Sequence, residues 1–238
     1  MEKPGSPTGR VSSPTRAAST SPKKSFPSIK EMKATLPDAP LDFSFMNLPT
    51  IMDILKEEPV SGRKKTDATG IQVAPLPTTS DGDAATPRTP WEPPVSIRLN
   101  NNCLTHLNDL DKALGAVFLK PARLQWIDLS GNAIESLPPA VFEPYVELMT
   151  VHLHANHLCK YSDIDSLACL TKLRHLTLHG NPVEEKKHYR NYTIFHLPSL
   201  LELDFSCVTR CDRERAEAWS ITYRKKLARR RGEDIYDD

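Results

Sequence analysis

One arrangement of apolar residues and asparagine returns four times along this chain, and it constrains the fold more than any other feature. Its clearest copy has apolar residues at Leu173, Leu176 and Leu178, followed by Asn181 and Val183. This spacing matches neither an amphipathic helix nor a strand with sustained alternation. The other three copies begin at Pro94, Leu124 and Leu148. A unit that recurs in this way predicts a stack of similar structural units.

The shared template is L-x-x-L-x-L-x-x-N-x-L, which is the signature of leucine-rich repeats. Its L-x-L pair predicts a short strand with both apolar side chains on one face. No single repeat can bury that face alone, so the repeats must stack continuously. We therefore predict an α/β fold, a leucine-rich repeat solenoid with a short parallel sheet on the concave face, a helical convex side and a disordered N-terminal tail.

The asparagines of the template lie 30, 24 and 25 residues apart, at Asn102, Asn132, Asn156 and Asn181. Each follows a predicted strand, where the chain turns and leaves backbone groups unpaired inside. An amide side chain both donates and accepts, so it is suited to satisfy such groups. The four residues are predicted to form a structural ladder along the solenoid.

The segments that return along the convex side are predicted to be helical. "LNDLDKALGAVFL" and "DSLACLTKL" both carry apolar residues at helical spacing. The second helix is expected to begin after Asp165 or Ser166, because either side chain can act as an N-cap.

Composition divides the chain into six segments. Most of the 21 prolines fall in the first 90 or so residues, and such segments bury too little apolar surface to fold alone. The predicted order is a disordered basic Ser/Pro-rich tail at 1–39, an apolar docking or N-cap segment at 40–62, a Pro/Thr-rich linker at 63–91, leucine-rich repeats at 92–183, a last repeat and C-terminal cap at 184–222, and a charged tail at 223–238.

The segment 40–62 differs from the rest of the N-terminal region because it is rich in leucine, isoleucine, phenylalanine and methionine. "LPTIMDILKEEP" predicts a short helix that begins at Thr50 and ends at Pro59. Such an apolar patch should not remain exposed to water. It is expected to cover the open edge of the first repeat, or alternatively to dock on a partner.

The C-terminal end of the solenoid also needs a closing unit. "LLELDF" predicts a last strand, although Val208 takes the place of the asparagine. The tyrosines at 189 and 192, with Phe195 and Trp219, resemble the cap of intracellular leucine-rich repeat proteins.

The concave strands expose the third, fifth and seventh positions of the template, which form the expected partner-binding surface of a repeat protein. The candidate partner-binding residues are Arg98, Trp126, Asp128, His152, His154, His175, His179 and Asp204. Trp126, between the small residues Ser96 and Thr150, is predicted to be exposed and to contact a partner. The alternative is that it packs across its strand neighbours or under the N-terminal tail.

The concave histidines also raise the question of a metal, since three imidazoles can bind zinc. We favour a polar, pH-sensitive contact surface in which Asp128 pairs with His152. The prediction is therefore no metal and no cofactor. The sequence has no phosphate-binding glycine loop, nucleophile elbow or metalloprotease helix, so no catalytic residue is predicted.

Charge and cysteine content limit the other function classes. A formal net charge of +1 argues against a globally basic nucleic-acid binder, and no stretch is long and apolar enough to span a membrane. The N-terminus lacks the apolar core of a signal peptide. The five cysteines include no C-x-x-C pair, which favours reduced thiols in a cytoplasmic protein.

Both ends of the chain carry basic runs. Residues 1–30 contain six basic residues against one acid, and "YRKKLARRR" lies near the C-terminus, where it suits a solvated helix end, an acidic surface or nuclear import. Candidate phosphorylation sites, each followed by proline, are Ser6, Ser13, Ser21, Thr86 and Thr89. Phosphates there would cancel local positive charge and release the tail from an acidic surface such as a tubulin lattice. The alternative is an unmodified spacer.

Taken together, "PLDFSF", "EEPVSG", "IRLNNNCL", "WIDLSGN", "LTLHGNPVEEKKHYRNY" and "LDFSCVTRCDRERAEAW" resemble the leucine-rich repeat-containing protein 51 family over roughly residues 40–220. The last repeat and cap are also similar to spliceosomal A-prime-type proteins and to an axonemal dynein leucine-rich light chain. The first resemblance implies a non-enzymatic protein of ciliated cells. The leading hypothesis is a structural subunit of a ciliary or flagellar axonemal complex with axonemal or cytoskeletal partners. The alternatives are a nuclear or ribonucleoprotein scaffold and a phosphatase-regulating repeat protein.

Overall fold

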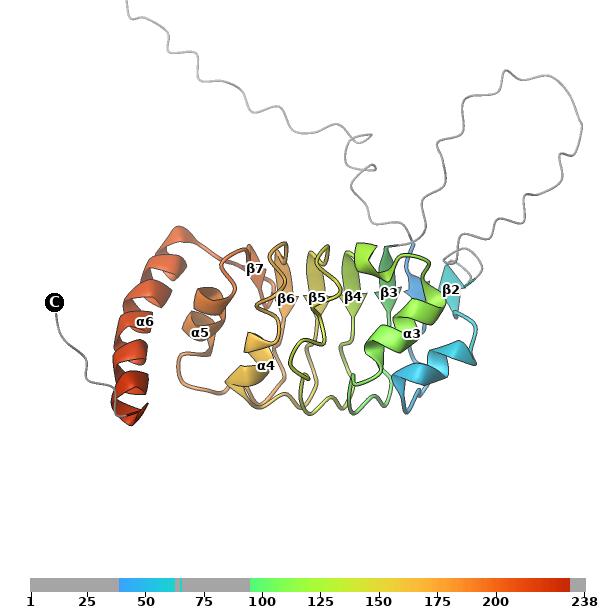
Figure 1. Ribbon diagram of the computed structural model, residues 1–238, viewed down its shortest axis with the longest axis horizontal. Coiled ribbons are helices and arrows are strands. Elements are labelled where there is room, and N and C mark those ends of the chain that lie inside the picture. The colour runs from blue at the N-terminus through green and yellow to red at the C-terminus, as the bar shows by residue number, and fades with distance from the viewer. Residues whose placement is uncertain (1–38, 63–64, 66–94, 232–238) are drawn as a thin grey trace, which may run out of the picture. The chain divides into compact units, whose positions relative to one another are not determined.

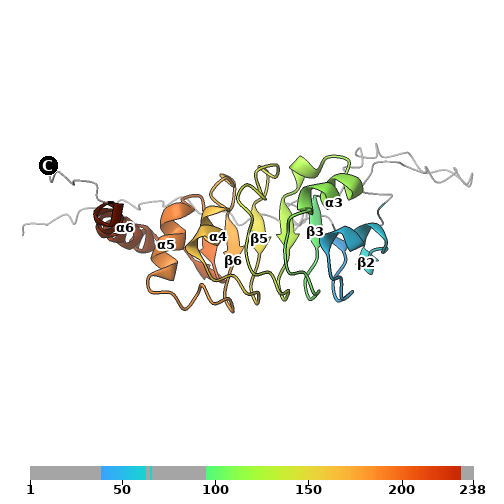
Figure 2. The ribbon, with the colours of Figure 1, turned by 60° about the horizontal axis from the view of Figure 1, so that its bottom comes forward.

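The computed structural model describes residues 39–62, 65 and 95–231, and these form one elongated unit (Figure 1). The strands lie side by side along its length and form one side of the solenoid. The helices α3, α4 and α5 lie on the opposite, convex side, and α6 lies across one end (Figures 1 and 2). Every buried apolar residue of the core lies between Leu41 and Ala216. The predicted solenoid of leucine-rich repeats is confirmed.

One sheet runs through the whole unit, with the strand order β2-β1-β3-β4-β5-β6-β7-β8. Neighbouring strands from β1 to β7 are parallel, and each end is closed by an antiparallel hairpin partner. The strands are β1 (Leu41–Asp42), β2 (Ser61–Gly62), β3 (Ser96–Arg98), β4 (Trp126–Asp128), β5 (Thr150–His152), β6 (His175–Thr177), β7 (Glu202–Leu203) and β8 (Ser206–Cys207). Only short strands fit, because each repeat turns inward immediately after its L-x-L pair.

The apolar positions of the template form the core. Ile97, Ile127, Val151, Leu176 and Leu203 stand opposite one another in consecutive strands and are at most 1% exposed. Their side chains point away from the concave surface, because alternate residues of a strand face opposite sides. The sheet is thus buried on one side and open on the other.

The asparagines lie in the turns after the strands and are 2–8% exposed. Asn156 shows the arrangement: its Nδ2 donates to the carbonyls of Leu129 and Leu153 at 3.0 Å each, and its Oδ1 accepts from Ile134 N at 3.0 Å. Asn132 and Asn181 likewise donate to a carbonyl of the preceding repeat. Each side chain therefore joins two adjacent repeats through buried backbone groups.

The segment 40–62 packs against the first repeat. β1 pairs with β3, Phe43 N donates to Arg98 O at 2.8 Å, and Asn102 Nδ2 donates to Phe43 O at 2.8 Å. The predicted helix is shorter than expected and is a 3-10 helix, η1 (Ile51–Leu55). It begins at Thr50, whose hydroxyl donates to Asp53 at 2.7 Å, but it ends before Pro59 is reached.

The return segments differ from one repeat to the next. The first is helical as predicted, in α3 (Leu110–Val117), and the 3-10 helix η2 (Pro121–Arg123) follows it. The third has the short helix α4 (Tyr161–Asp165), which ends where a helix was predicted to begin. From Ile164 onward the buried leucines recur every three residues, with hydrogen bonds such as Leu167 N to Ile164 O at 3.0 Å. Spacing of three favours successive 3-10 turns over an α-helix.

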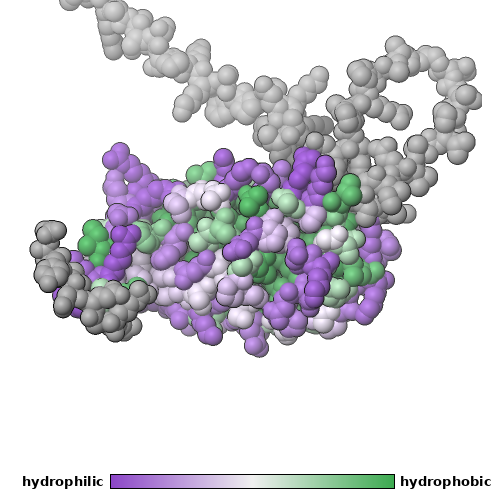
Figure 3. Space-filling model, viewed as in Figure 1, coloured by the Kyte–Doolittle hydropathy of each residue, from purple (hydrophilic) through white to green (hydrophobic). Residues whose placement is uncertain are grey.

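The C-terminal cap consists of α5 (Tyr189–His196), the β7–β8 hairpin and α6 (Arg210–Arg231). Tyr192 stacks on Tyr161 of the preceding repeat at 3.9 Å between ring centroids, and Trp219 of α6 lies 6.0 Å from Tyr192. α6 continues through the boundary predicted at residue 222, so the basic run belongs to a helix. α6 exposes mainly hydrophilic side chains (Figure 3), and Ala216 and Ser220 are its buried residues.

Two glycines give a matched test of the turn geometry. Gly131 has a φ of +63°, and a Cβ there would lie 2.5 Å from Asn101 Oδ1. Gly131→Ala is expected to lower the free energy of unfolding by about 1–2 kcal/mol, since a side chain at positive φ is strained. Gly115→Ala, in α3 with nothing within 4 Å, is expected to raise it by about 0.5–1 kcal/mol. Urea titrations should show changes of opposite sign in the free energy of unfolding of the two variants. Equal changes in both variants would contradict this account of the turn.

Candidate protein-binding face

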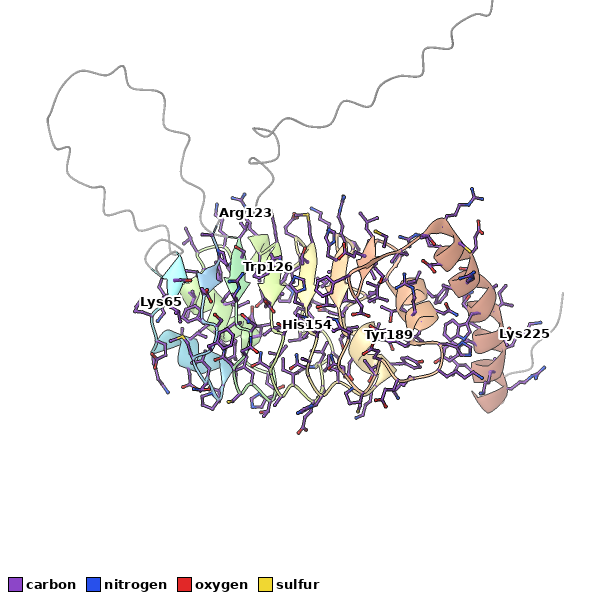
Figure 4. All side chains as sticks on the ribbon, turned by 180° about the vertical axis from the view of Figure 1, so that it is seen from behind. Lys65, Arg123, Trp126, His154, Tyr189 and Lys225 are labelled. Atoms are coloured by element: carbon purple, nitrogen blue, oxygen red, sulfur yellow. The ribbon has the colours of Figure 1, made fainter. Side chains whose placement is uncertain are left out.

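The open side of the sheet carries a cluster of rings that we call the concave cluster, made up of Trp126, His152, His154, His179 and Phe205. Trp126 contacts His152 edge-on at 5.5 Å between ring centroids, and His154 stacks on His179 at 4.6 Å. Trp126 and His154 lie between the two ends of the solenoid in Figure 4, where Lys65 and Lys225 mark those ends. The parallel register produces the cluster: Trp126 stands opposite Thr150 and so lies diagonal to His152, while His154 and His179 both take the seventh template position of consecutive repeats.

Phe205 was not predicted to belong to this face. Its side chain is 66% exposed and its ring lies 5.5 Å from His179 and 6.5 Å from His152. The template assigns Phe205 an inward position, but β7 ends at Leu203, and Asp204 and Phe205 both adopt positive φ, 51° and 58°. This tight turn into β8 rotates the ring onto the concave side. In the sequence, the polar Asp204 and Ser206 on either side of Phe205 could have indicated a hairpin turn at this point.

Asp204 was predicted to belong to the partner-binding face, and in the structure its carboxylate is engaged within the protein. Its Oδ1 accepts from Leu178 N at 2.6 Å and His179 N at 2.9 Å, and its Oδ2 accepts from Tyr189 OH at 2.8 Å. In earlier repeats such backbone N–H groups are satisfied by the next repeat. The chain reverses after Leu203 and no further repeat follows, so the Asp204 carboxylate accepts these hydrogen bonds instead. Its side chain remains 18% exposed.

Trp126 is half-buried rather than exposed as predicted. In addition to His152, its ring is covered by the Arg98 guanidinium, with 5.7 Å from Cζ to the ring centroid. Arg98 also lies 3.6 Å from the carboxylate of Asp42 in the N-terminal cap segment. Arg98 is therefore held at the edge of the cluster by one ring and one carboxylate.

Thr177 hydrogen-bonds to two histidines of the concave cluster, His152 and His154. Its hydroxyl is 3.2 Å from His152 Nδ1 and 2.8 Å from His154 Nδ1, and the residue is 2% exposed. A hydroxyl has one proton to donate, so with both rings neutral one Nδ1 accepts and the other donates. Since Nδ1 of each ring is engaged, Nε2 of each is the nitrogen left for a partner.

Burial lowers the pKa of both histidines below the ordinary value of 6.5. For His152, desolvation is the largest cause, opposed by the charges of Asp128 and Glu202 and reinforced by His154 and His175. For His154, desolvation is again the largest cause, with His179 adding to it and Asp128 and Asp204 opposing it. Near neutral pH the imidazoles of His152 and His154 are therefore mostly uncharged, and these two rings present a largely apolar surface.

These shifts make stability depend on pH. Because the folded histidines have lowered pKa values, the unfolded chain binds more protons below its ordinary His pKa of about 6.5. The free energy of unfolding is expected to fall as the pH drops through this range. Urea midpoints at about pH 7.5 and about pH 5 should differ less in a His152→Gln/His154→Gln variant than in the wild type. An unchanged difference would show that the two rings do not titrate in this way.

Two further histidines of the predicted set face acids. His175 Nδ1 is 3.5 Å from Glu202, and His179 Nδ1 is 3.4 Å from Asp204, so either pair is ionic only when the imidazole is protonated. Asp128 accepts from Ser130 N at 3.0 Å and from its hydroxyl at 2.6 Å. The predicted pairing of Asp128 with His152 is electrostatic, without a hydrogen bond between the described atoms.

A shallow hollow of about 650 Å³ adjoins the cluster next to α5. Its lining includes His179, Phe205, His188, Arg190 and Tyr189, so it continues the ring surface into a more polar area. His179 and Phe205 belong to both the concave cluster and the hollow, so the two lie side by side.

Other kinds of site receive no support from the part of the chain that the structure describes. Within it, no three His, Cys, Asp or Glu side chains are arranged to hold a metal ion, and no helix is long and apolar enough to cross a membrane. The candidate phosphorylation sites Ser6, Ser13, Ser21, Thr86 and Thr89 lie outside the described residues.

Comparison with known proteins agrees with the geometry. A family model described as "Leucine-rich repeat" matches residues 102–231. Leucine-rich repeat-containing protein 51 of Bos taurus is 37% identical over 188 residues, which cover 79% of this chain and 88% of that protein, and the Homo sapiens protein is 36% identical over the same shares. The chain belongs to the leucine-rich repeat proteins and, among them, to the family of leucine-rich repeat-containing protein 51.

More distant similarity exists to a ribonucleoprotein component. U2 small nuclear ribonucleoprotein A′ of Schizosaccharomyces pombe is 39% identical over 100 residues, 42% of each chain. The crystal structure of the Drosophila melanogaster SNF/U2A′ complex matches with 29% identity and a TM-score of 0.49, covering 57% of this chain and 73% of that one.

Proposed function

We propose that this protein is a non-enzymatic scaffold whose concave cluster binds a segment of another protein. The observation that carries the proposal is Phe205, a phenylalanine that is 66% exposed and contacts the rings of His152, His154 and His179 on the open side of the sheet. Exposed apolar patches bordered by polar residues are typical of protein interaction sites, and aromatic residues contribute much of the binding free energy there.

The rigidity of the face also supports this function. The rings project from hydrogen-bonded strands, Thr177 fixes two imidazoles, and Asp204 holds the turn that presents Phe205. Little side-chain freedom is left to lose when a partner binds, and the cost in entropy is correspondingly low. A preformed face of this kind suits constitutive assembly of a larger complex.

The setting we propose is a ciliary or flagellar axonemal complex, such as a radial spoke or another doublet-associated assembly. The setting follows the expectation, drawn from the sequence resemblance, that a member of the leucine-rich repeat-containing protein 51 family belongs to ciliated cells; the comparison supports the family membership. The basic N-terminal run and the basic end of α6 suit contacts with an acidic cytoskeletal surface such as the tubulin lattice. The location that we propose is thus the cytoplasm, on the axoneme.

A nuclear ribonucleoprotein scaffold is the second candidate. The identity of 39% over 100 residues with U2 small nuclear ribonucleoprotein A′ favours it. The basic run in α6 would there serve nuclear import or contact with ribonucleoprotein partners.

Fractionation of a tagged full-length copy from a ciliated cell separates the two settings. After detergent extraction we expect the protein to remain with axonemes and to resist moderate salt. Recovery with nuclei and co-sedimentation with small nuclear ribonucleoproteins would overturn the axonemal proposal in favour of the second. Recovery of the protein in the soluble extract, with neither axonemes nor nuclei, would contradict both the axonemal and the nuclear setting.

A further inference from the structure

The outward positions of the sheet carry acidic side chains that have no basic partner. Among the outward residues of the described strands β1 and β3–β7 there is no lysine, and the arginine there, Arg98, lies 3.6 Å from the carboxylate of Asp42. Asp128 and Glu202 form no ion pair with a lysine or arginine of the described residues. Glu202 faces His175 at 3.5 Å, and that imidazole is charged only when protonated.

The basic residues of the neighbouring hollow are engaged elsewhere. Lys186 and Arg190 line the hollow beside α5. Arg190 is 3.3 Å from the carboxylate of Asp212, and Lys186 lies over the Tyr161 ring, 5.4 Å from its centroid. The outward acids of the sheet are therefore left to be compensated by a partner.

The strand order sets these acids on either side of the rings. β5 and β6 lie between β4 and β7 (Figure 1), so the histidines of their repeats lie between Asp128 on β4 and Glu202 on β7. Neighbouring strands are about 4.8 Å apart, so three spacings separate the two acids by roughly 14 Å. Phe205, which follows β7, adds an exposed ring to the same side. A segment that crosses these strands meets a carboxylate, then rings, then a second carboxylate.

This order is suited to a segment with basic side chains on either side of apolar ones. The aliphatic stem of lysine or arginine packs against rings, and its charged group favours both an aromatic face and a nearby carboxylate. An acidic or phosphorylated segment would instead meet like charge at both ends. Extended chain spans about 3.3 Å per residue, so the two basic residues of an extended segment would be about four positions apart.

We propose that the concave cluster binds a segment of a partner protein that carries two lysine or arginine residues with apolar residues between them. The basic residues lie beside Asp128 and Glu202, and the apolar residues lie on Phe205 and the histidine rings. This inference rests on the proposed function, because it names the chemistry of the segment that the scaffold binds. Charge complementarity of this kind contributes mainly to the choice of partner and the rate of association, and salt weakens it.

Carbodiimide coupling to the full-length protein tests the site, because the reagent joins an amine to a carboxylate that lies against it. The probe is a short peptide, blocked at both ends, with two lysines about four positions apart and leucines between them. Peptide mapping is expected to find it on Asp128 and Glu202 in several-fold higher yield than on Glu135 and Glu143 of a return segment. These two control acids are the more exposed, so solvent access alone would give the opposite order.

Matched variants separate the rings from the acids. Phe205→Ala keeps every reacting group and should lower the coupling yield at Glu202 several-fold, as should a peptide with serines in place of the leucines. Val146→Ala, an exposed apolar residue outside the concave positions, should leave the yield unchanged. In a ciliated cell, full-length Glu202→Gln should leave the axoneme at lower salt than Glu143→Gln, which makes the same change of charge on a return segment.

Other outcomes overturn the proposal. Coupling that follows exposure alone would show that the face has no preference for the basic peptide. Equal salt resistance of Glu202→Gln and Glu143→Gln, with Phe205→Ala released, would leave the concave cluster as the binding site but exclude a basic segment as its occupant. Self-association in light scattering that Glu202→Gln abolishes would make a second copy of this chain the occupant. The proposed function fails separately, if Phe205→Ala leaves axonemal retention intact.

Discussion

Replacing Asn156 with alanine is expected to lower the free energy of unfolding by about 3–5 kcal/mol. The amide is 2% exposed and donates to the carbonyls of Leu129 and Leu153, while it accepts from Ile134 N. Its removal leaves these backbone groups buried without partners, and each one costs about 1–3 kcal/mol. Because the bonds join two repeats, the loss should weaken the stacking of the repeats as well as the local turn.

The measurement is a urea titration followed by circular dichroism, with His157→Ala as the control. His157 is the next residue and is exposed, so its replacement should change stability by less than about 0.5 kcal/mol. A neutral Asn156→Ala would contradict the structural role of the asparagine ladder.

Phe43→Ala is expected to have an effect of similar size, about 3–5 kcal/mol. The ring is fully buried, and the backbone of Phe43 bonds to Arg98 and Asn102 of the first repeat. Its loss leaves a cavity between the N-terminal segment and the first repeat and uncovers the edge of β3. Exposed sheet edges pair with other chains, so the variant should also aggregate more readily.

Phe45→Ala is the matched control, because the same residue type lies two positions further on and is 71% exposed. It should be close to neutral in thermal melting and in light scattering. Equal losses in both variants would mean that the segment 40–62 does not close the solenoid through Phe43.

The repeated template predicts most of this fold because each position has a single physical role. Leu176 and Leu178 are inside since they alternate along a strand, and Asn181 lies in the turn since its amide satisfies both a backbone donor and backbone acceptors there. The same register predicts that His154 and His179 share the concave side, where they stack. These features follow from the periodicity of the sequence alone, without knowledge of contacts between residues far apart in the chain.

The departures occur where the period ends. After Leu203 no further repeat follows, so the chain reverses, Phe205 turns outward and Asp204 takes over backbone hydrogen bonding. A template extended by one repeat therefore places Phe205 inside and does not anticipate the hydrogen bonds of Asp204. The return segments are also less predictable, because leucine spacing of three near Ile164 fits both a helix and successive 3-10 turns.

The central claim, that a partner occupies the concave cluster, is tested most directly by axonemal retention of full-length Phe205→Ala beside Val146→Ala. Both residues are exposed and apolar, so neither replacement should change folding, and circular dichroism checks this. The account predicts that Phe205→Ala is released by detergent and low salt while Val146→Ala remains bound. Retention of both variants at the wild-type level would contradict it.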